Sequence, residues 1–262
     1  MDYIIVAFAA LAVSGVALYS GFGLGTLLMP VFALFFPIPI AVASTAVVHM
    51  ANNIFRVIFV GRGADLRVVL TFGIPAAALA IPGAFLLVQM SNMTPIATYN
   101  IGETEFAITA IKLVVAGLIL AFAGFELLPY FSRTEFPRRW VPLGGALSGF
   151  FGGLSGHQGA LRSAVLANTG LDTPAFVGTV SVCAFMVDIS RIAVYGFTFF
   201  AEDFTDVSGG NSIALVGVAT LAACVGTYAS SRFLKQVTMT TIRRVVATML
   251  VAIGLALASG LV

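Results

Sequence analysis

The sequence predicts an all-α integral membrane protein, a polytopic helix bundle of two inverted-topology repeats, each a broken-helix hairpin followed by three transmembrane helices. Three observations lead to this fold class. The chain is 60% hydrophobic and 9% charged, with a mean hydropathy of +1.06, so a soluble fold would lack the polar surface that it needs. Two long apolar stretches are interrupted by glycines, and basic residues gather in alternate loops. We expect one membrane domain over residues 1–262, with repeat one at 1–132 and repeat two at 140–262.

The apolar segments define the elements in order. The stretch from Tyr3 to Phe36 is interrupted by the run Ser20 to Gly25, and the stretch from Trp140 to Thr169 by the run Ser155 to Gly159. Each stretch is either a hairpin of two short helices or one kinked helix. Six further spans are uninterrupted and long enough to cross about 30 Å of hydrocarbon. They run from Ile38 to Val60, Val68 to Val88, Phe106 to Phe131, Pro174 to Phe200, Ser212 to Ser231 and Val245 to Val262.

The loops favour the hairpin over the kinked helix. Lys and Arg in short loops mark the cytoplasmic side, and two loops that lack them, Met90 to Glu105 and Ala201 to Asn211, are expected outside. Each interrupted stretch must then cross the membrane an even number of times, and the two halves enter it from opposite sides. Both termini are expected on the outer side of the membrane, and the acidic start at Asp2 argues against a cleaved signal peptide. The basic loop residues are Arg62, Arg67, Arg133, Arg138, Arg139, Arg232, Lys235, Arg243 and Arg244.

The two halves share a weak similarity at an offset of 135 residues. In each half, a broken helix is followed by a span that carries an Asx-x-x-Arg pair. Glycine matches alone would mean little in a glycine-rich chain, but the repeated Asx and Arg spacing is harder to dismiss. Broken helices and buried charge in both halves predict a transporter for a small anion. The matched pairs are Gly21 with Gly156, Asn53 with Asp188, Arg56 with Arg191, and Gly61 with Gly196.

The hairpin turns are candidate anion sites. A helix that starts at a turn inside the membrane directs unpaired N–H groups and the positive end of its dipole into the bundle. Gly25 and Gly159 belong to these turns, where glycine permits positive φ angles and close approach. The alternative is that these glycines only let helices pack closely, as small residues do in membranes.

Two arginines are candidate ligand or gating residues. Arg56 and Arg191 lie in predicted spans, where a charge costs about 2.5–3.5 kcal/mol and is normally retained for a partner or a ligand. A guanidinium matches the oxygens of sulfite, a sulfonate or a carboxylate. Arg56 could instead extend to the cytoplasmic interface, and Arg191 could form a purely structural ion pair with Asp188, one helical turn away.

Further polar residues complete the candidate site. His157 and Gln158 fall in the second turn, and Asn52 and Asn53 lie one turn after His49. His49 is a possible proton relay, because imidazole titrates near neutral pH, or else a polar packing residue. Arg162 can add positive charge beyond the second turn. The candidate substrate-binding set is His157, Gln158, Arg191, Asp188, Arg56, Asn53, Asn52, Gly25 and Gly159.

Several classes of activity have no support in the sequence. Two histidines without clustered carboxylates or thiols do not make a metal site, and no nucleophile is paired with a base at a recognisable spacing. We therefore expect no enzyme activity, no cofactor, no metal and no nucleic acid. The expected partners are a small anionic substrate and the lipid bilayer, and a homodimer is an open alternative.

Three motifs resemble the sulfite exporter TauE/SafE family. They are the glycine turn followed by Thr26 to Pro30, the span opening Ala41 to Thr45, and the run from Leu147 through Gly159. The resemblance covers nearly the whole chain and implies a bacterial or plant permease for sulfite, sulfonates or related small organic anions. Where family members more usually carry further glycines, this chain has His157 and Gln158.

Together, the residues and the resemblance predict a secondary transporter, operating as an exporter, of a small anion such as sulfite or an organosulfonate like sulfoacetate. It would work by alternating access, with the anion held near the midplane between the two turns. Alternatives are a passive small-anion channel, a transporter for a short-chain carboxylate and, with least support, a membrane-embedded enzyme or redox subunit.

Overall fold

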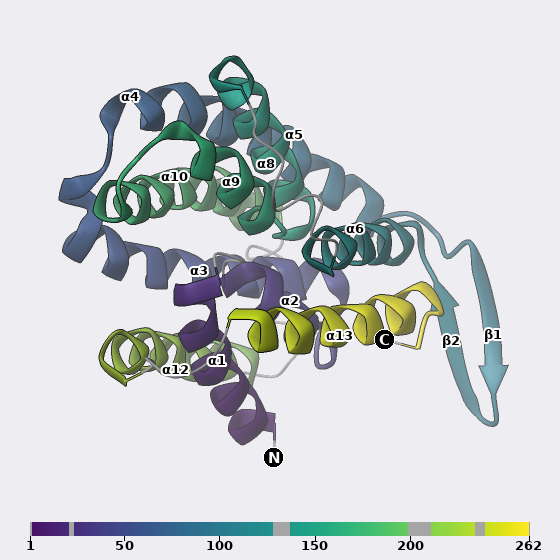
Figure 1. The fold of residues 1–262 in the computed structure, drawn as a ribbon. Coiled ribbons are helices and arrows are strands. Elements are labelled where there is room, and N and C mark those ends of the chain that lie inside the picture. The colour runs from purple at the N-terminus through teal and green to yellow at the C-terminus, as the bar shows by residue number, and fades with distance from the viewer. Residues whose placement is uncertain (1, 21–23, 128–136, 199–210, 234–238, 262) are drawn as a thin grey trace.

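The computed structural model describes residues 2–20, 24–127, 137–198, 211–233 and 239–261, and within them the fold is mostly helical (Figure 1). The first half contains α1 (Asp2–Ser20), α2 (Leu24–Ala33), α3 (Ile38–Val60), η1 (Gly61–Gly63), α4 (Leu66–Val68), the π-helical η2 (Val69–Gly73), α5 (Ile74–Ser91), the strands β1 (Ala97–Ile101) and β2 (Thr104–Ile108), and α6 (Ala110–Leu127). The second half contains η3 (Arg138–Trp140), α8 (Val141–Ser155), α9 (Gly159–Leu166), η4 (Ala167–Thr169), α10 (Thr173–Thr198), α12 (Asn211–Phe233) and α13 (Met239–Ala258).

The second interrupted stretch folds as a helical hairpin. Helix α8 stops at Gly156, whose φ of +80° is a left-handed conformation that favours glycine. Gly144, near the start of α8, lies against Val165, near the end of α9, so α9 runs back along α8. In the first stretch, α1 and α2 flank residues 21–23, so Gly21 and Gly23 of the predicted turn lie outside the described residues.

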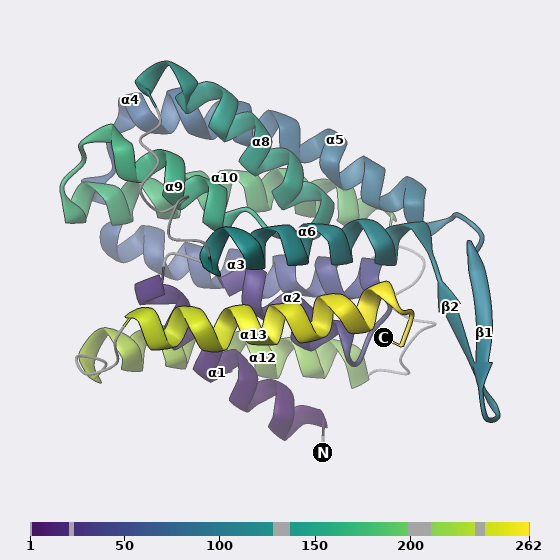
Figure 2. The ribbon, with the colours of Figure 1, turned by 45° about the vertical axis from the view of Figure 1, so that its right-hand side comes forward.

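The principal helix pairs in the described part of the chain are α5 with α8, α1 with α12, α6 with α13, and α10 with both α3 and α5. Figure 2 shows α5 and α8 along one side of the bundle and α1 and α12 along the other, with α2, α3, α9 and α10 between them. A Cβ atom at Gly145, Gly149 or Gly153 of α8 would collide with backbone of η2 or α5, and one at Gly226 of α12 with the Leu11 carbonyl of α1. For these glycines close helix packing is the evident role.

A β-hairpin replaces part of a predicted loop and helix. The sequence predicted a loop from Met90 to Glu105 and a span beginning at Phe106, but β1 and β2 pair antiparallel and project from the bundle. Strand-forming residues flank a tight turn in which Gly102 has a φ of +64°, and this local pattern outweighs the apolar run. Helix α6 begins only after Thr109, whose hydroxyl accepts a backbone N–H from the first turn at 3.3 Å.

The last predicted span is also wrong in its bounds. Helix α13 begins at Met239, before the predicted start at Val245, and ends at Ala258. It stops there because Gly260 takes a φ of +82°, which breaks the helical hydrogen bonding. The predicted span from Ile38 to Val60, in contrast, has the same bounds as α3.

The described helices have the length and surface of membrane-spanning elements. Three segments are long and apolar enough to cross a bilayer, Ile38–Gly63, Leu66–Ser91 and Thr173–Thr198, and several shorter apolar helices accompany them. Large apolar side chains such as Phe8, Phe59 and Phe197 are exposed on the outside of the bundle, where lipid is their natural neighbour. The protein is therefore integral to a membrane.

Candidate functional site

A fully buried carboxylate, that of Asp188, lies at the centre of the polar interior. It sits near the middle of α10, and its side chain is 0% exposed. Arg191, one turn later on the same helix, donates to Oδ1 from Nε at 3.0 Å and from Nη2 at 2.7 Å. Two guanidinium nitrogens thus donate to one carboxylate oxygen in a charge-assisted interaction, so the structural ion pair weighed from the sequence is present in the fold.

Helix α3 contributes two more groups to the same carboxylate. His49 Nδ1 lies 2.7 Å from Asp188 Oδ2, and Asn53 Nδ2 donates to that oxygen, also at 2.7 Å. His49 and Asn53 are one helical turn apart, which places both side chains on the face of α3 that meets α10. A carboxylate can only accept from the imidazole, so Nδ1 of His49 carries a proton.

The second hairpin turn completes the arrangement. Gln158 Nε2 donates to Asp188 Oδ1 at 3.4 Å, and Arg191 Nη1 donates to the carbonyl of Gly152 at 3.3 Å. We call Asp188, His49, Asn53, Gln158 and Arg191 the central cluster. It joins α3, α10 and the turn after α8 through one carboxylate whose two oxygens are both fully used.

The first hairpin reaches this turn as well. A Cβ atom at Gly25, near the start of α2, would lie 3.0 Å from the carbonyl oxygen of Gly156 and 3.7 Å from the ring of His49. Gly25 is therefore required for close approach, and residues of the two predicted hairpin turns meet beside the central cluster.

His157 lies in the turn but outside the cluster. Its Nδ1 is 2.9 Å from the backbone carbonyl of Ser155, and its ring stacks on Phe122 of α6 with centroids 5.9 Å apart. Its second ring nitrogen, Nε2, is buried without a hydrogen-bond partner among the described residues.

Four of the six buried polar atoms that lack a hydrogen-bond partner among the described residues belong to the second hairpin, and the other two lie on α3. Buried polar groups in proteins are nearly always hydrogen-bonded, so each orphan calls for an explanation such as a water, an ion or a ligand. Arg162 of α9 is 2% exposed, and no side-chain hydrogen bond to it occurs among the described residues. The buried atoms that lack a partner there are Nε of Arg56, Nε and Nη1 of Arg162, Nε2 of His157, Oε1 of Gln158 and Oγ of Ser44.

The remaining candidates take separate places. Asn52 points to α12, where its Oδ1 accepts from the hydroxyl of Thr227 at 2.9 Å. Arg56 is only half-buried and makes no bond to the central cluster, and Gly159 is the buried first residue of α9. The structure thus brings His49, Asn53, Gln158, Asp188 and Arg191 together, places Gly25 and His157 beside them, and leaves Asn52, Arg56 and Gly159 outside direct contact.

Some partners escape prediction from the sequence. Thr227 and Phe122 lie in apolar helices far along the chain from the residues that they contact, and no local signal marks them. Ser155 and Ser148 support the turn, since Ser148 Oγ donates to the carbonyl of Gln158 at 3.0 Å. Ser155 lies two residues before His157 in the glycine-rich run, so its position in the sequence could have predicted a contact with the turn.

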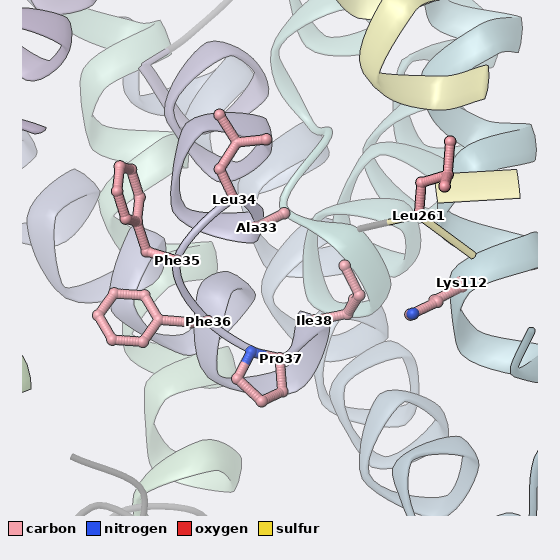
Figure 3. A pocket seen from close by; sticks show the side chains of 8 residues that line it. All are labelled: Ala33, Leu34, Phe35, Phe36, Pro37, Ile38, Lys112 and Leu261. Carbon is pink, nitrogen blue, oxygen red and sulfur yellow. The ribbon is translucent and has the colours of Figure 1, made fainter. Parts of the chain in front are cut away.

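A cavity of about 410 Å³ lies elsewhere, where α2, α3 and α6 meet. Figure 3 shows Lys112 extending toward Ile38, with Phe35 and Phe36 on the opposite side. The Lys112 ammonium donates to the carbonyls of Ala107 at 3.0 Å and Gly260 at 3.3 Å. The cavity is mainly apolar and includes no residue of the central cluster, so the polar chemistry of the molecule is not located there.

A broken helix that turns beside a buried charged centre is a feature found in polytopic membrane transporters. Residues 3–257 match the family described as sulfite exporter TauE/SafE. The match covers nearly the whole chain, and the protein belongs to this family. Members of the family are transporters, not enzymes. Comparisons with curated proteins and with solved structures gave no match.

Proposed function

We propose that the protein is a secondary transporter that exports a small anion, such as sulfite or an organosulfonate like sulfoacetate, across a bacterial inner membrane. The observation that carries the proposal is the set of buried guanidinium atoms without partners beside the turn of the second hairpin. Cationic groups are retained in a membrane interior when a partner or a ligand compensates them. The family supports transport of sulfite-type anions.

The proposed architecture is a pair of inverted-topology repeats within one domain. If α8 corresponds to α1 and α12 to α5, the packing of α1 on α12 and that of α5 on α8 become equivalent pairs. The pairs α3 with α10 and α6 with α13 each join corresponding helices. Asn53 and Asp188, matched at the offset of 135 residues, also contact each other directly. This exchange of partners supports a pseudo-two-fold relation, which would place the substrate between the halves.

In the proposed transport cycle, the anion lies beside the two hairpin turns while access alternates between the two sides. Gly25 against Gly156 gives the halves a close contact at this point. Movement of one hairpin relative to the other would open the site on one side at a time. The central cluster would keep α3, α10 and the second turn in register while the bundle moves.

His49 is proposed as the proton relay, held in place by Asp188. Protonation there would be influenced by Arg191 on α10 and Arg162 on α9, both within electrostatic range, with His157 in the adjoining turn. In proteoliposomes, H49Q should abolish the stimulation of sulfite flux by a pH gradient while sulfite exchange at equal pH continues. Unchanged stimulation by the gradient would remove His49 from the coupling step.

The proposal is tested by counterflow of radiolabelled sulfite in proteoliposomes. A secondary transporter preloaded with unlabelled sulfite accumulates label transiently and saturates with concentration. A passive channel dissipates the gradient without counterflow or saturation. Loading with acetate or lactate instead separates sulfite and sulfonate transport from that of short-chain carboxylates, and absence of flux for every anion would overturn the proposal.

A further inference from the structure

Arg162 is a buried cation that has no hydrogen-bonded counterion among the described residues. It lies on α9, one turn after the hairpin turn, and its side chain makes no hydrogen bond to any described residue. Asp188 is the only buried carboxylate among the side chains that the structure describes. Arg191, His49, Asn53 and Gln158 already occupy both of its oxygens, so it makes no hydrogen bond to Arg162 and acts on that charge only from a distance.

Arg56 is a second guanidinium in the same condition. Its Nε is buried without a partner. Arg56 follows His49 and Asn53 on α3 at positions i+7 and i+3, so it shares the helix face that meets the second half of the molecule, and its charge interacts with that of Arg162. These two like charges repel each other. In addition, N–H donors of both guanidinium groups have no acceptor, which water would provide outside the membrane. An anion between them would relieve both conditions.

The charge count indicates the valence of that anion. Arg56, Arg162 and Arg191 supply three positive charges and Asp188 one negative charge. These four side chains therefore carry an excess of two positive charges, and protonation of a histidine would only add to it. A monoanion would leave one of them, whereas a dianion would balance the region.

We propose that Arg162 and Arg56 form a two-guanidinium site for a doubly charged oxyanion, and that Arg191 is a positioning residue held by Asp188. The site deepens the proposed function and rests on it, since it names the residues and the valence by which the transported anion is bound. Guanidinium forks fit the oxygens of sulfite or sulfate, or the sulfonate and carboxylate groups of a small sulfocarboxylate. His157 Nε2 and Gln158 Oε1, also without partners, are available to polar groups of the same ligand.

Matched ligands test the valence. Binding to purified protein is measured by calorimetry and thermal shift for sulfate against methanesulfonate, and for sulfoacetate against methanesulfonate, at constant ionic strength. Each pair keeps a sulfur oxyanion and differs by one negative charge. We expect at least tenfold tighter binding of the dianion in both pairs. Equal or tighter binding of methanesulfonate would overturn the proposal.

Matched variants test the residues. R162Q and R56Q should each weaken sulfate and sulfite binding at least tenfold, whereas R67Q, which removes an exposed arginine of α4, should leave it unchanged. R162K keeps the charge without the fork and should retain part of the affinity, which provides a folded comparison. R162Q should also raise the melting temperature of the ligand-free protein, because it removes an uncompensated cation.

The outcomes separate the two proposals. If sulfite counterflow is present and R162Q and R56Q bind dianions like the unmodified protein, the two-guanidinium site is wrong and the transport proposal stands. If the unmodified protein neither binds nor transports any anion tested, both the transport proposal and the two-guanidinium site are wrong.

Discussion

Arg56 and Arg191 occupy matched positions in the two halves, yet their surroundings differ. Arg191 has an acid three residues earlier, Asp188, and makes a 2.7 Å ion pair with it. Arg56 has the amide Asn53 at the corresponding place, and its Nε has no partner. The same spacing therefore gives one neutralised guanidinium and one uncompensated guanidinium. The two halves differ because Asp188 carries a negative charge and Asn53 does not. This difference gives Arg191 a role in holding the fold and Arg56 a proposed role in binding an anion.

The largest effect is expected from a substitution of Asp188, the acid that pairs with Arg191. D188N removes the carboxylate that holds Arg191 and His49, and it leaves a buried guanidinium without its partner. Removal of one member of a buried ion pair typically costs about 3–5 kcal/mol. We expect the unfolding free energy in detergent to fall by about that amount, with a lowered melting temperature. An unaltered unfolding curve would show that the cluster does not stabilise the fold.

Arg191 and Arg56 should differ in how much stability the protein loses when each is replaced by glutamine. R191Q leaves Asp188 without its ion-pair partner and should destabilise the protein by about 3 kcal/mol. R56Q removes no observed side-chain bond and takes away a cation with a buried, unpartnered Nε, so it should leave the unfolding free energy unchanged or raise it by up to about 0.5 kcal/mol. Equal destabilisation by the two variants, measured in one denaturant series, would erase the distinction between the paired and the unpaired arginine.

Moving the acid from one half to the other sharpens the comparison further. Asn53 Nδ2 lies 2.7 Å from Asp188 Oδ2, so an acid at position 53 would sit almost where the carboxylate now lies. The double variant N53D/D188N should therefore recover about 1–2 kcal/mol of the stability lost in D188N, because the buried acid is restored close to His49 and Arg191. The check is a double-mutant cycle with N53D alone, in which two adjacent carboxylates should repel. Strict additivity of the two changes would contradict this expectation.

The main helices follow from the sequence, because each is an apolar run bounded by glycine, proline or charge. The span predicted at residues 38–60 matches α3 at both ends. The β-hairpin was not predicted, since a search for apolar runs does not separate strand-forming residues such as Tyr99 and Phe106 from the start of a helix. The apolar run that ends the chain likewise does not reveal where a left-handed glycine stops α13.

The candidate site was predictable in its residue types but not in its pairings. Charges and glycines inside apolar spans mark Asp188, Arg191 and the hairpin turn. The contact between His49 and Asp188 joins residues 139 positions apart and depends on how α3 packs against α10. Which arginine is neutralised, in contrast, is readable from the sequence, because Arg191 has an acid three residues earlier whereas Arg56 has an amide at that place.

The smallest expected effect concerns the turn that places Gln158 and Arg162 relative to the paired arginine. G156A introduces a side chain at a φ of +80°, a conformation that costs an alanine about 1–2 kcal/mol, and its Cβ would lie 3.3 Å from Arg191 Nη1. The matched control is G117A on α6, where a Cβ meets nothing within 4 Å and alanine should raise stability by up to about 1 kcal/mol. Thermal unfolding of the two variants should therefore shift in opposite directions. If G156A were as harmless as G117A, the turn would be free to adopt another conformation, and the fixed geometry that separates Arg162 from the ion pair would not be maintained by this glycine.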